Sequence, residues 1–307
     1  MKHKGITSST NTARVGIVRV ENIDDDALVR AQTYALLDML KENIRIPAVA
    51  RVVVKVNLCL LLDCETGATI DQRLVRYLAE WLLERCGARE IIIAESDATA
   101  LDADRAYACL GWDQMLANVP RTRYLNLTKD EQVTITLDGL LFKEIAMSRT
   151  FMEADYLISF AKLKTHSMQV ISGVMKNQFG ALPEKLKVIY HPHLAEAICD
   201  LVRVRPPDLC LVDGLIAHEG PGPVSGLPRL MRLIIGGTDA VATDHACARL
   251  MGKDPRRVPH LKLAARYKIG TNLYETVGCC MDEVAEDFAF IPRWRQAWMG
   301  LRERMQY

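Results

Sequence analysis

The chain contains 307 residues, of which 50% are hydrophobic and 25% are charged, and its formal net charge is +1. This composition is typical of a soluble globular protein with one large or two medium-sized domains, and the neutral balance argues against a nucleic-acid-binding surface. The amino terminus lacks the apolar core of a signal peptide, and no apolar run approaches the roughly 18 residues of a membrane span. We therefore expect a cytoplasmic protein with no membrane or nucleic-acid partner.

Short β-rich runs alternate with helical patterns along the chain, which predicts an α/β fold with a doubly wound, mainly parallel sheet and helices on both faces. The predicted strands are Val15–Val20, Arg51–Asn57, Glu90–Ala94, Asp155–Phe160, Asp208–Val212 and Arg232–Ile235. The predicted helices are Asp25–Glu42, Asp71–Cys86, Asp104–Ala117, Ser167–Phe179, His193–Val202 and Asp239–Leu250.

One segment interrupts this alternation. Two short strands within Thr134–Ile145, joined by Asp138-Gly139, predict a small hairpin outside the main sheet. We expect residues 13–252 to form the α/β domain, with two lobes that meet near residues 150–165 as an alternative division. Residues 253–307 are expected to form a helical extension, with helices around Pro259–Lys268 and Trp294–Met305.

Polar side chains end or follow five of the predicted strands. They are Lys55 and Asn57; Glu95, Ser96 and Asp97; Lys162, Lys164 and His166; Asp213; and Thr238 and Asp239. The carboxyl ends of the strands in a doubly wound sheet lie along one edge, where ligands bind, so we expect these residues to share one site. Loops are polar in general, but lysine has no turn-forming role, and the lysines are therefore the stronger signal.

Lys162, Lys164 and His166 occupy every second position after an apolar run, so an extended backbone would point them to one side. Lys176 lies on the following predicted helix and can reach back toward them. Together the lysines predict a cradle for a carboxylate or phosphate, although they could instead extend their charged ends into solvent. Asn57 and Asn177 are further candidates for contacts with a bound ligand or cofactor, and Asn177 could alternatively help to end its helix. These two asparagines complete the candidate residues of the cradle.

A candidate metal site is built from histidines and aspartates. His191 and His193 flank Pro192, which favours an extended backbone with both rings on one side, and His166 or Asp213 could supply a third ligand. The alternative is the start of a helix at Pro192. Asp239 and Asp244 are the remaining metal candidates. Asp239 is expected first of all to cap a helix. Asp244 is an unusual residue within an apolar helix unless it meets a lysine or a metal.

Gly220, Gly222 and Gly226 form a glycine-rich loop whose backbone N–H groups could approach an anion, such as part of a cofactor. The loop matches neither a P-loop nor a dinucleotide fingerprint, and a rigid surface turn is the alternative. His218 and Glu219, which precede it, are candidates for acid–base chemistry.

The nine cysteines are expected to be reduced thiols, and their spacing does not match the ligand set of a ferredoxin-type iron–sulfur cluster. We therefore expect no such cluster in this chain, and a divalent metal is the cofactor that the candidate ligands allow. Cys279 and Cys280 are adjacent and could serve redox chemistry with a partner protein.

Assembled in order, these segments resemble the DUF362 family, a domain of unknown function. The resemblance runs from about residue 55 to 252 and rests on KVNL at 55–58, GATIDQRLVRYLAEWLLERCGAREIIIAES at 67–96, AKLKTHSMQVISGVMKNQFGALP at 161–183, LVDGLIAHEGPGPVSGLP at 211–228 and GGTDAVATDHACARLMG at 236–252. Many relatives carry ferredoxin-type cysteine clusters that this chain lacks. The resemblance implies a shared site at the strand ends and supplies no reaction.

Three functions remain open at this point. The first is an enzyme in which Lys162, Lys164 and Lys176 hold a small anionic substrate and His166 transfers a proton. In this enzyme Asp213, Asp239 or Asp244 completes a metal or acid–base site. Because no dinucleotide fingerprint is present, isomerase, lyase or group-transfer chemistry is favoured over hydride transfer. The second is a redox or iron–sulfur-associated protein that works with a partner, and the third is a non-catalytic ligand-binding module.

Overall fold

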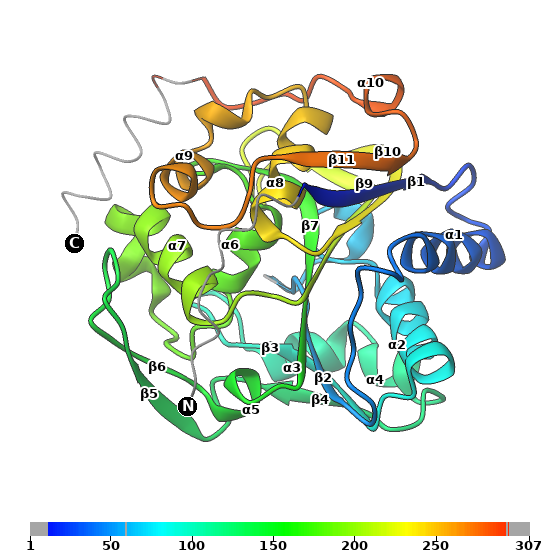
Figure 1. Cartoon of the computed structure of the whole chain (residues 1–307), viewed down its shortest axis with the longest axis horizontal. Helices are drawn as coiled ribbons and strands as arrows, with labels where there is room; N and C mark the ends of the chain where they lie inside the picture. Colours follow the sequence, from blue (N-terminus) through cyan, green and yellow to red (C-terminus); the bar gives the residue numbers. More distant parts are fainter. Residues whose placement is uncertain (1–11, 59, 293, 295–307) are drawn as a thin grey trace.

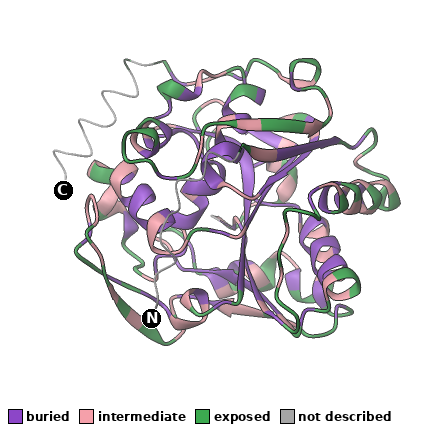
Figure 2. Ribbon diagram, in the orientation of Figure 1, coloured by how far each residue is buried: buried purple, intermediate pink, exposed green. Residues whose placement is uncertain are grey.

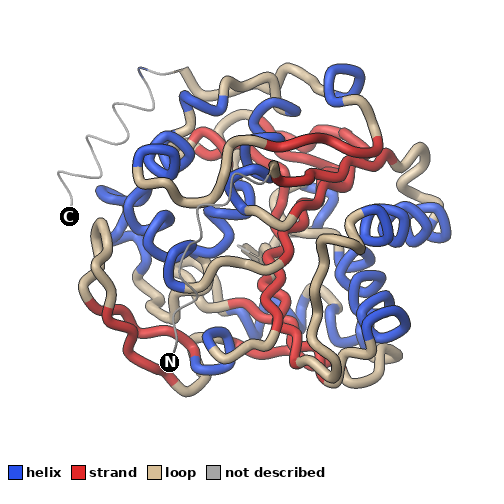
Figure 3. The backbone as a smooth tube through the Cα atoms, viewed as in Figure 1, coloured by secondary structure: helices blue, strands red, loops and turns tan. Residues whose placement is uncertain are grey.

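The computed structural model describes residues 12–58, 60–292 and 294. Within these residues the main sheet has nine strands, eight of them in the order β11-β1-β10-β9-β7-β2-β3-β4, with the short β8 pairing with β7. Their bounds are β1 Ala13–Arg19, β2 Arg51–Lys55, β3 Glu90–Glu95, β4 Thr122–Asn126, β7 Tyr156–His166, β8 Val170–Ile171, β9 Leu209–Glu219, β10 Leu227–Gly237 and β11 Tyr274–Gly278. Figure 3 shows these strands running through the middle of the molecule.

The sheet is mainly parallel. β2 pairs in parallel with β3 and β7, β3 with β4, β7 with β9, and β1 with β11. Only β10, among the strands of the eight-strand path, runs against its neighbours β1 and β9. The chain visits β2, β3 and β4 in one direction across the sheet and then β7 and β9 in the other. The strand order therefore reverses between β2 and β7, which confirms the predicted doubly wound α/β fold.

Helices cover both faces of the sheet. Their bounds are α1 Asp26–Met39, α2 Gln72–Cys86, α3 Ala103–Cys109, α4 Trp112–Leu116, α5 Arg149–Met152, α6 Gly173–Phe179, α7 Leu194–Val204, α8 Ala240–Leu250, α9 Pro259–Arg266 and α10 Met281–Val284. Helices α1 to α4 pack on one face and α6 to α9 on the other, and the two sets lie on opposite sides of β7 in Figure 1. No helix in the described part of the chain is both long and apolar enough to cross a membrane.

Each face has its own apolar core because successive side chains of a strand point to opposite faces. In β2, Val53 belongs to the core under α6 to α9, whereas Val52 and Val54 belong to the core under α1 to α4. All three valines are fully buried. β7 is buried along its whole length, and Figure 2 shows it in the colour of buried residues. Water cannot solvate a charged group on a strand that is buried on both faces, so any charge there needs a partner within the protein.

The predicted hairpin forms a separate two-stranded antiparallel sheet, β5 Gln132–Thr136 and β6 Glu144–Ser148. Its turn is held by Asp200 of α7, whose carboxylate accepts hydrogen bonds from the backbone N–H groups of residues 140, 141 and 142. The hairpin thus lies against the helical layer that covers one face of the main sheet.

The helix predicted over Ser167–Phe179 begins later than expected. The side chain of His166 accepts hydrogen bonds from the N–H groups of Met168 and Gln169, and the chain turns back so that β8 pairs with β7. Helix α6 then starts at Gly173, whose φ of 67° suits a residue without a Cβ. The turn therefore replaces the first six residues of the predicted helix.

The expectation that five strand ends share one edge was wrong for one strand. Because β10 is antiparallel, Thr238 and Asp239, which follow it, lie at the amino-terminal edge of its neighbours. The segment after residue 252 also contributes β11 to the main sheet beside β1, in addition to the predicted helix near Pro259. The helix predicted over Trp294–Met305 lies outside the described residues except for Trp294.

Candidate functional site

Two buried ion pairs join neighbouring parallel strands, one at the ends of β2 and β3 and the other in the part of β7 and β9 that runs beyond the end of β2. Lys55 Nζ at the end of β2 lies 2.6 Å from Glu95 Oε1 at the end of β3. Lys162 Nζ in β7 donates to Asp213 Oδ2 in β9 at 2.7 Å, and both side chains are at most 1% exposed. Asp213 also accepts from the N–H groups of Asp71 and Leu215. Each carboxylate is thus fully surrounded by donors, which offsets the cost of burying it.

A chain of side-chain amides connects these strands across the point where their order reverses. Lys164 Nζ in β7 donates to Asn57 Oδ1 beyond β2 at 2.9 Å, and it also donates to the carbonyl oxygen of Ala68 at 2.7 Å. Asn57 Nδ2 donates to Asn177 Oδ1 at 3.3 Å, and Lys55 Nζ lies 3.5 Å from the same oxygen. The β2–β7 boundary is the place where doubly wound sheets bind their ligands.

A third component is Lys187, in the 3₁₀ helix Lys187–His193. Its ammonium donates to Ser96 Oγ at 2.5 Å, to the Asp97 carbonyl oxygen at 2.6 Å and to the Gly180 carbonyl oxygen at 3.3 Å. All three acceptors are uncharged, and no ion pair joins Lys187 to a carboxylate of the described residues. Burial, aided by the nearby charge of Lys55, lowers the pKa of Lys187 from 10.5 to about 7.

We call Lys55, Lys162, Lys164 and Lys187 the lysine cluster. All four side chains are buried. The carboxylates that pair with them in the described part of the chain are those of Glu95 and Asp213. Buried ammonium groups are stable only when paired or strongly hydrogen bonded. The lysine cluster therefore gathers four buried amino groups at the ligand-binding edge of the sheet.

His166 lies next to this site but is held in its neutral form. Burial lowers the pKa of His166 well below its usual value, and the charges of Lys176, His191 and Lys164 add to the effect. Since Nδ1 accepts the two backbone hydrogen bonds of the following turn, the ring proton is on Nε2. The Lys176 ammonium lies 4.9 Å from the centre of the Phe179 ring, a cation–π contact on α6.

The four residues predicted as metal ligands are not brought together. His191 and His193 lie in a 3₁₀ helix, so the expected extended backbone was wrong: Pro192 fits within this short helix. Their side chains at i and i+2 then point in different directions. Asp239 caps α8 by accepting from Ala242 N, as its first interpretation predicted. In the described residues, no group of three His, Cys, Asp or Glu side chains is arranged to hold a metal.

Asp244 has a role that sequence reasoning missed. Its fully buried carboxylate accepts from the N–H groups of Val174 at 2.6 Å and Met175 at 2.9 Å, the first turn of α6. Ser172, at the N-cap position, makes no side-chain capping bond. Asp244 of α8 therefore caps α6 from a neighbouring helix, and in this way it positions Lys176 and Asn177.

The glycine-rich loop packs against β7 and β9. The N–H group of Gly220 donates to Ala289 O, that of Gly222 to Gly220 O, and that of Gly226 to His218 Nε2. A Cβ at Gly222 would lie 2.1 Å from the Thr165 carbonyl oxygen, so the close approach requires glycine. The three amides thus donate within the protein, and the loop closes over the end of β7. Cys279 and Cys280, which follow β11, are free thiols.

Sequence reasoning found part of the lysine cluster and missed the rest. The structure brings Lys162 together with Asp213, and Lys164 with Asn57 and Asn177. Lys55 and Glu95 were recognised as polar strand ends, and the signal that could have selected them is the same one that selected Lys162, a charge that closes an apolar β-run. Lys187 had no such signal, because it lies among other charged residues in a loop.

Two solved or curated proteins and one family model are similar to this chain. A thylakoid-associated protein of Synechocystis sp. is 32% identical over 142 residues, and the matched segment covers 44% of each protein. The lactate racemase apoprotein from Thermoanaerobacterium thermosaccharolyticum matches with a TM-score of 0.51 and 9% identity, over 79% of this chain and 57% of that one, which shows a shared fold. The model of DUF362, a domain of unknown function, matches residues 52–249, and the chain therefore belongs to the DUF362 family.

Proposed function

We propose that this protein is an enzyme that binds a small carboxylate at the lysine cluster and moves a proton to or from the bound molecule, in a reaction of the isomerase class. The observation that carries the proposal is the gathering of four buried lysines at the ligand-binding edge of the sheet. A bound anion would offset part of the cost of burying their ammonium groups.

The lysines divide into two roles. Lys55 and Lys162 are each paired with a carboxylate and hold the framework of the site. Lys164 donates to Asn57 Oδ1 and to the carbonyl oxygen of Ala68, and its place on β7, where the strand order reverses, makes it our candidate for the contact to the substrate anion. An ammonium group that meets an amide and a carbonyl can exchange one of them for a carboxylate with a gain in electrostatic energy.

Lys187 is our candidate for the proton-transfer group. General acid–base catalysis is most efficient when the pKa of the group is close to the working pH, and the pKa of Lys187 is about 7. At neutral pH, both its protonated and its unprotonated forms are therefore populated. Its contacts with Ser96 and Gly180 hold the amine beside the ends of β3 and α6.

The fold comparison supports the same class of reaction. The apoprotein with the matching fold is named for the racemisation of lactate, which is a carboxylate whose isomerisation changes one carbon centre. We extend to this chain only the class of substrate, a small carboxylate, and the class of reaction.

The test combines binding with turnover. Lactate, other short 2-hydroxycarboxylates and inorganic phosphate, each with and without Mg²⁺, are screened for an increase in melting temperature of the full chain. Ligands that bind are then incubated in D₂O, and deuterium incorporation next to the carboxylate is followed by NMR. We expect Lys164→Met to lose the ligand-induced stabilisation and Lys187→Met to retain binding but lose exchange. Lys143→Met, at a side chain that is 78% exposed, is the control.

Two outcomes would contradict the proposal. If stabilisation occurs without deuterium exchange for every ligand, the protein is a binding module. If Lys164→Met responds to the ligand as the parent does, the substrate anion binds elsewhere.

A further inference from the structure

A second basic site lies at the opposite edge of the sheet. A cavity of about 500 Å³ is lined by Arg51, Arg89, Glu90, Arg121, Thr122 and Arg123. These residues begin, directly precede or lie near the start of three adjacent strands, β2, β3 and β4. β2 separates this cavity from Lys55 by four residue steps, or about 13 Å along an extended strand. The cavity is therefore distinct from the lysine cluster.

The charges in this cavity are strongly unequal. Four arginines and a single glutamate line the cavity, which leaves a surplus of three positive charges. Glu90 Oε2 accepts from Arg51 Nε at 3.2 Å and Glu90 Oε1 accepts from Arg123 Nε at 2.7 Å. Partial burial acts to raise the pKa of Glu90, but the hydrogen bond and charge of Arg123, together with Arg51, outweigh it and lower the pKa. Glu90 is thus ionised at neutral pH and holds two arginines in place.

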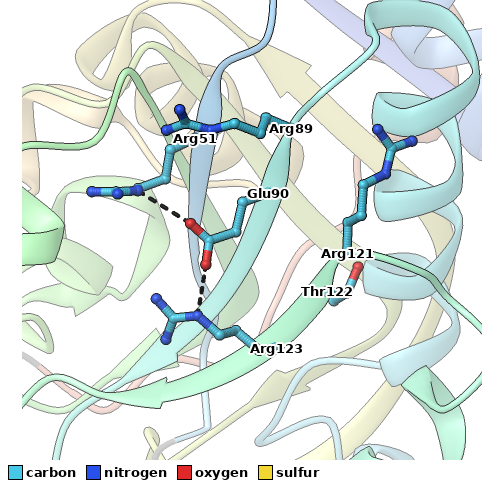
Figure 4. A pocket seen from close by; sticks show the side chains of 6 residues that line it. All are labelled: Arg51, Arg89, Glu90, Arg121, Thr122 and Arg123. Atoms are coloured by element: carbon cyan, nitrogen blue, oxygen red, sulfur yellow. Dashed lines mark hydrogen bonds and ion pairs between the residues drawn. The ribbon is translucent and has the colours of Figure 1, made fainter.

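The other two arginines face solvent. Arg89 and Arg121 have exposed side chains, and neither guanidinium group has a hydrogen bond or ion pair to the residues that the structure describes. Figure 4 shows Glu90 between Arg51 and Arg123, with the side chain of Arg89 reaching toward Arg51 and that of Arg121 standing apart from this group. Arg121 has a φ of 58°, a left-handed conformation that is costly for a residue with a Cβ. An arginine thus occupies a backbone position where glycine would be less strained.

From this arrangement we propose that the cavity binds a small molecule that carries two or more adjacent phosphate charges. Guanidinium groups recognise phosphate through paired, parallel hydrogen bonds, and they do so better than lysine. Two guanidinium groups are already oriented by Glu90, and two more are available for the ligand. The cavity volume lies within the range of small-ligand sites, roughly 300–1,000 Å³. A ligand with one charge would leave most of the surplus in place, so a diphosphate fits better than a single carboxylate.

The probe for this site is inorganic pyrophosphate. The full chain is titrated with pyrophosphate, and in parallel with phosphate, by isothermal calorimetry and by amide NMR of the ¹⁵N-labelled protein at low ionic strength. We expect pyrophosphate to bind more tightly than phosphate and to shift the amides of residues 89–91 and 121–123. Affinity should fall with added salt because the contact is exposed and ionic.

The key variant is Arg89→Gln/Arg121→Gln, which leaves the Glu90 contacts intact. Its affinity for pyrophosphate should fall by at least about tenfold, the effect of one charge-assisted hydrogen bond or more. The control, Lys143→Gln/Arg266→Gln, removes two exposed positive charges elsewhere and should bind pyrophosphate like the parent.

Three results would overturn the proposal. They are an absence of pyrophosphate binding by the parent, equal affinity in the parent and the double arginine variant, and amide shifts confined to the lysine cluster. A further binding experiment uses vesicles of phosphatidylcholine with and without an anionic phospholipid. Binding to the anionic vesicles without binding to free pyrophosphate would assign the arginines to a lipid headgroup surface instead.

Discussion

The substitution Lys187→Met tests whether an uncompensated charge is buried at the candidate site. Methionine has a similar length and no charge, so it can occupy the same space. It removes the ammonium group but leaves Ser96 Oγ and the carbonyl oxygens of Asp97 and Gly180 without their donor. The effect of these lost hydrogen bonds on stability does not depend on pH, because the three acceptors do not titrate. The effect of removing a titrating ammonium group does depend on pH. The pH dependence of the stability difference therefore isolates Lys187.

The magnitude follows from the pKa. A fall from 10.5 to about 7 corresponds to about 5 kcal/mol between the two protonation states, at about 1.36 kcal/mol per unit. Between pH 7 and 10.5 the unfolded chain binds a proton at Lys187 that the folded chain has lost, so the stability of the parent rises with pH. Over the range from pH 6 to pH 9 the parent should gain about 2.5 kcal/mol relative to Lys187→Met.

The assay is urea denaturation of both proteins at several pH values, followed by the fluorescence of the buried residues Trp81 and Trp112. Lys143→Met is the matched control, and its stability difference from the parent should stay nearly constant over this pH range because its ion pair with Asp138 is exposed to solvent and therefore weak. A difference between the parent and Lys187→Met that is equally constant would refute the reasoning, since it would mean that Lys187 titrates alike in the folded and unfolded chains.

Two further substitutions test the framework of the site. Lys162→Met should lower the free energy of unfolding by about 3 to 5 kcal/mol, because it leaves the buried Asp213 carboxylate without its cation. The double variant Lys162→Met/Asp213→Asn should recover part of that loss in the same urea assay. If Lys162→Met is as stable as the parent, the ion pair does not contribute to stability. Asp244→Ala should cost about 2 kcal/mol, because the N–H groups of Val174 and Met175 lose their acceptor. Amide hydrogen exchange in Asp244→Ala should become faster than in the parent within α6 but not within α2. Exchange in α6 at the parent's rate would exclude the capping role.

The fold class could be predicted because local pattern and final environment agree over most elements. The apolar run Val52–Val54 is buried on both faces of the sheet, as a central parallel strand requires. The strands β4 and β11 were not predicted, because they lie at the two edges of the sheet and are only partly buried. The β conformation of β4 depends on its pairing with β3, and that of β11 on its pairing with β1. β1 and β11 lie at opposite ends of the described chain, so no local pattern could reveal their pairing.

The direction of β10 had no local signature. Its residues read as a strand in either orientation, and its pairing with β1 and β9 decides that it is antiparallel. That single reversal carries Asp239 to the edge opposite Asp213, where it caps α8. The same limit applies to Asp244, whose partners Val174 and Met175 lie about 70 residues away in the chain.

The lysines show where the sequence is sufficient and where it is not. Lys162 and Lys164 could be selected from the sequence alone because a charge within an apolar strand cannot be left unpaired in a core. That argument requires a partner but does not name it, and the partners Asp213 and Asn57 come from other strands. Lys187 could not be selected, because its burial results from the packing of a loop against β3 and α6. The sequence by itself determined which strands are buried and which charges need partners, whereas only the tertiary structure decided which groups meet, because those contacts depend on strand order and direction.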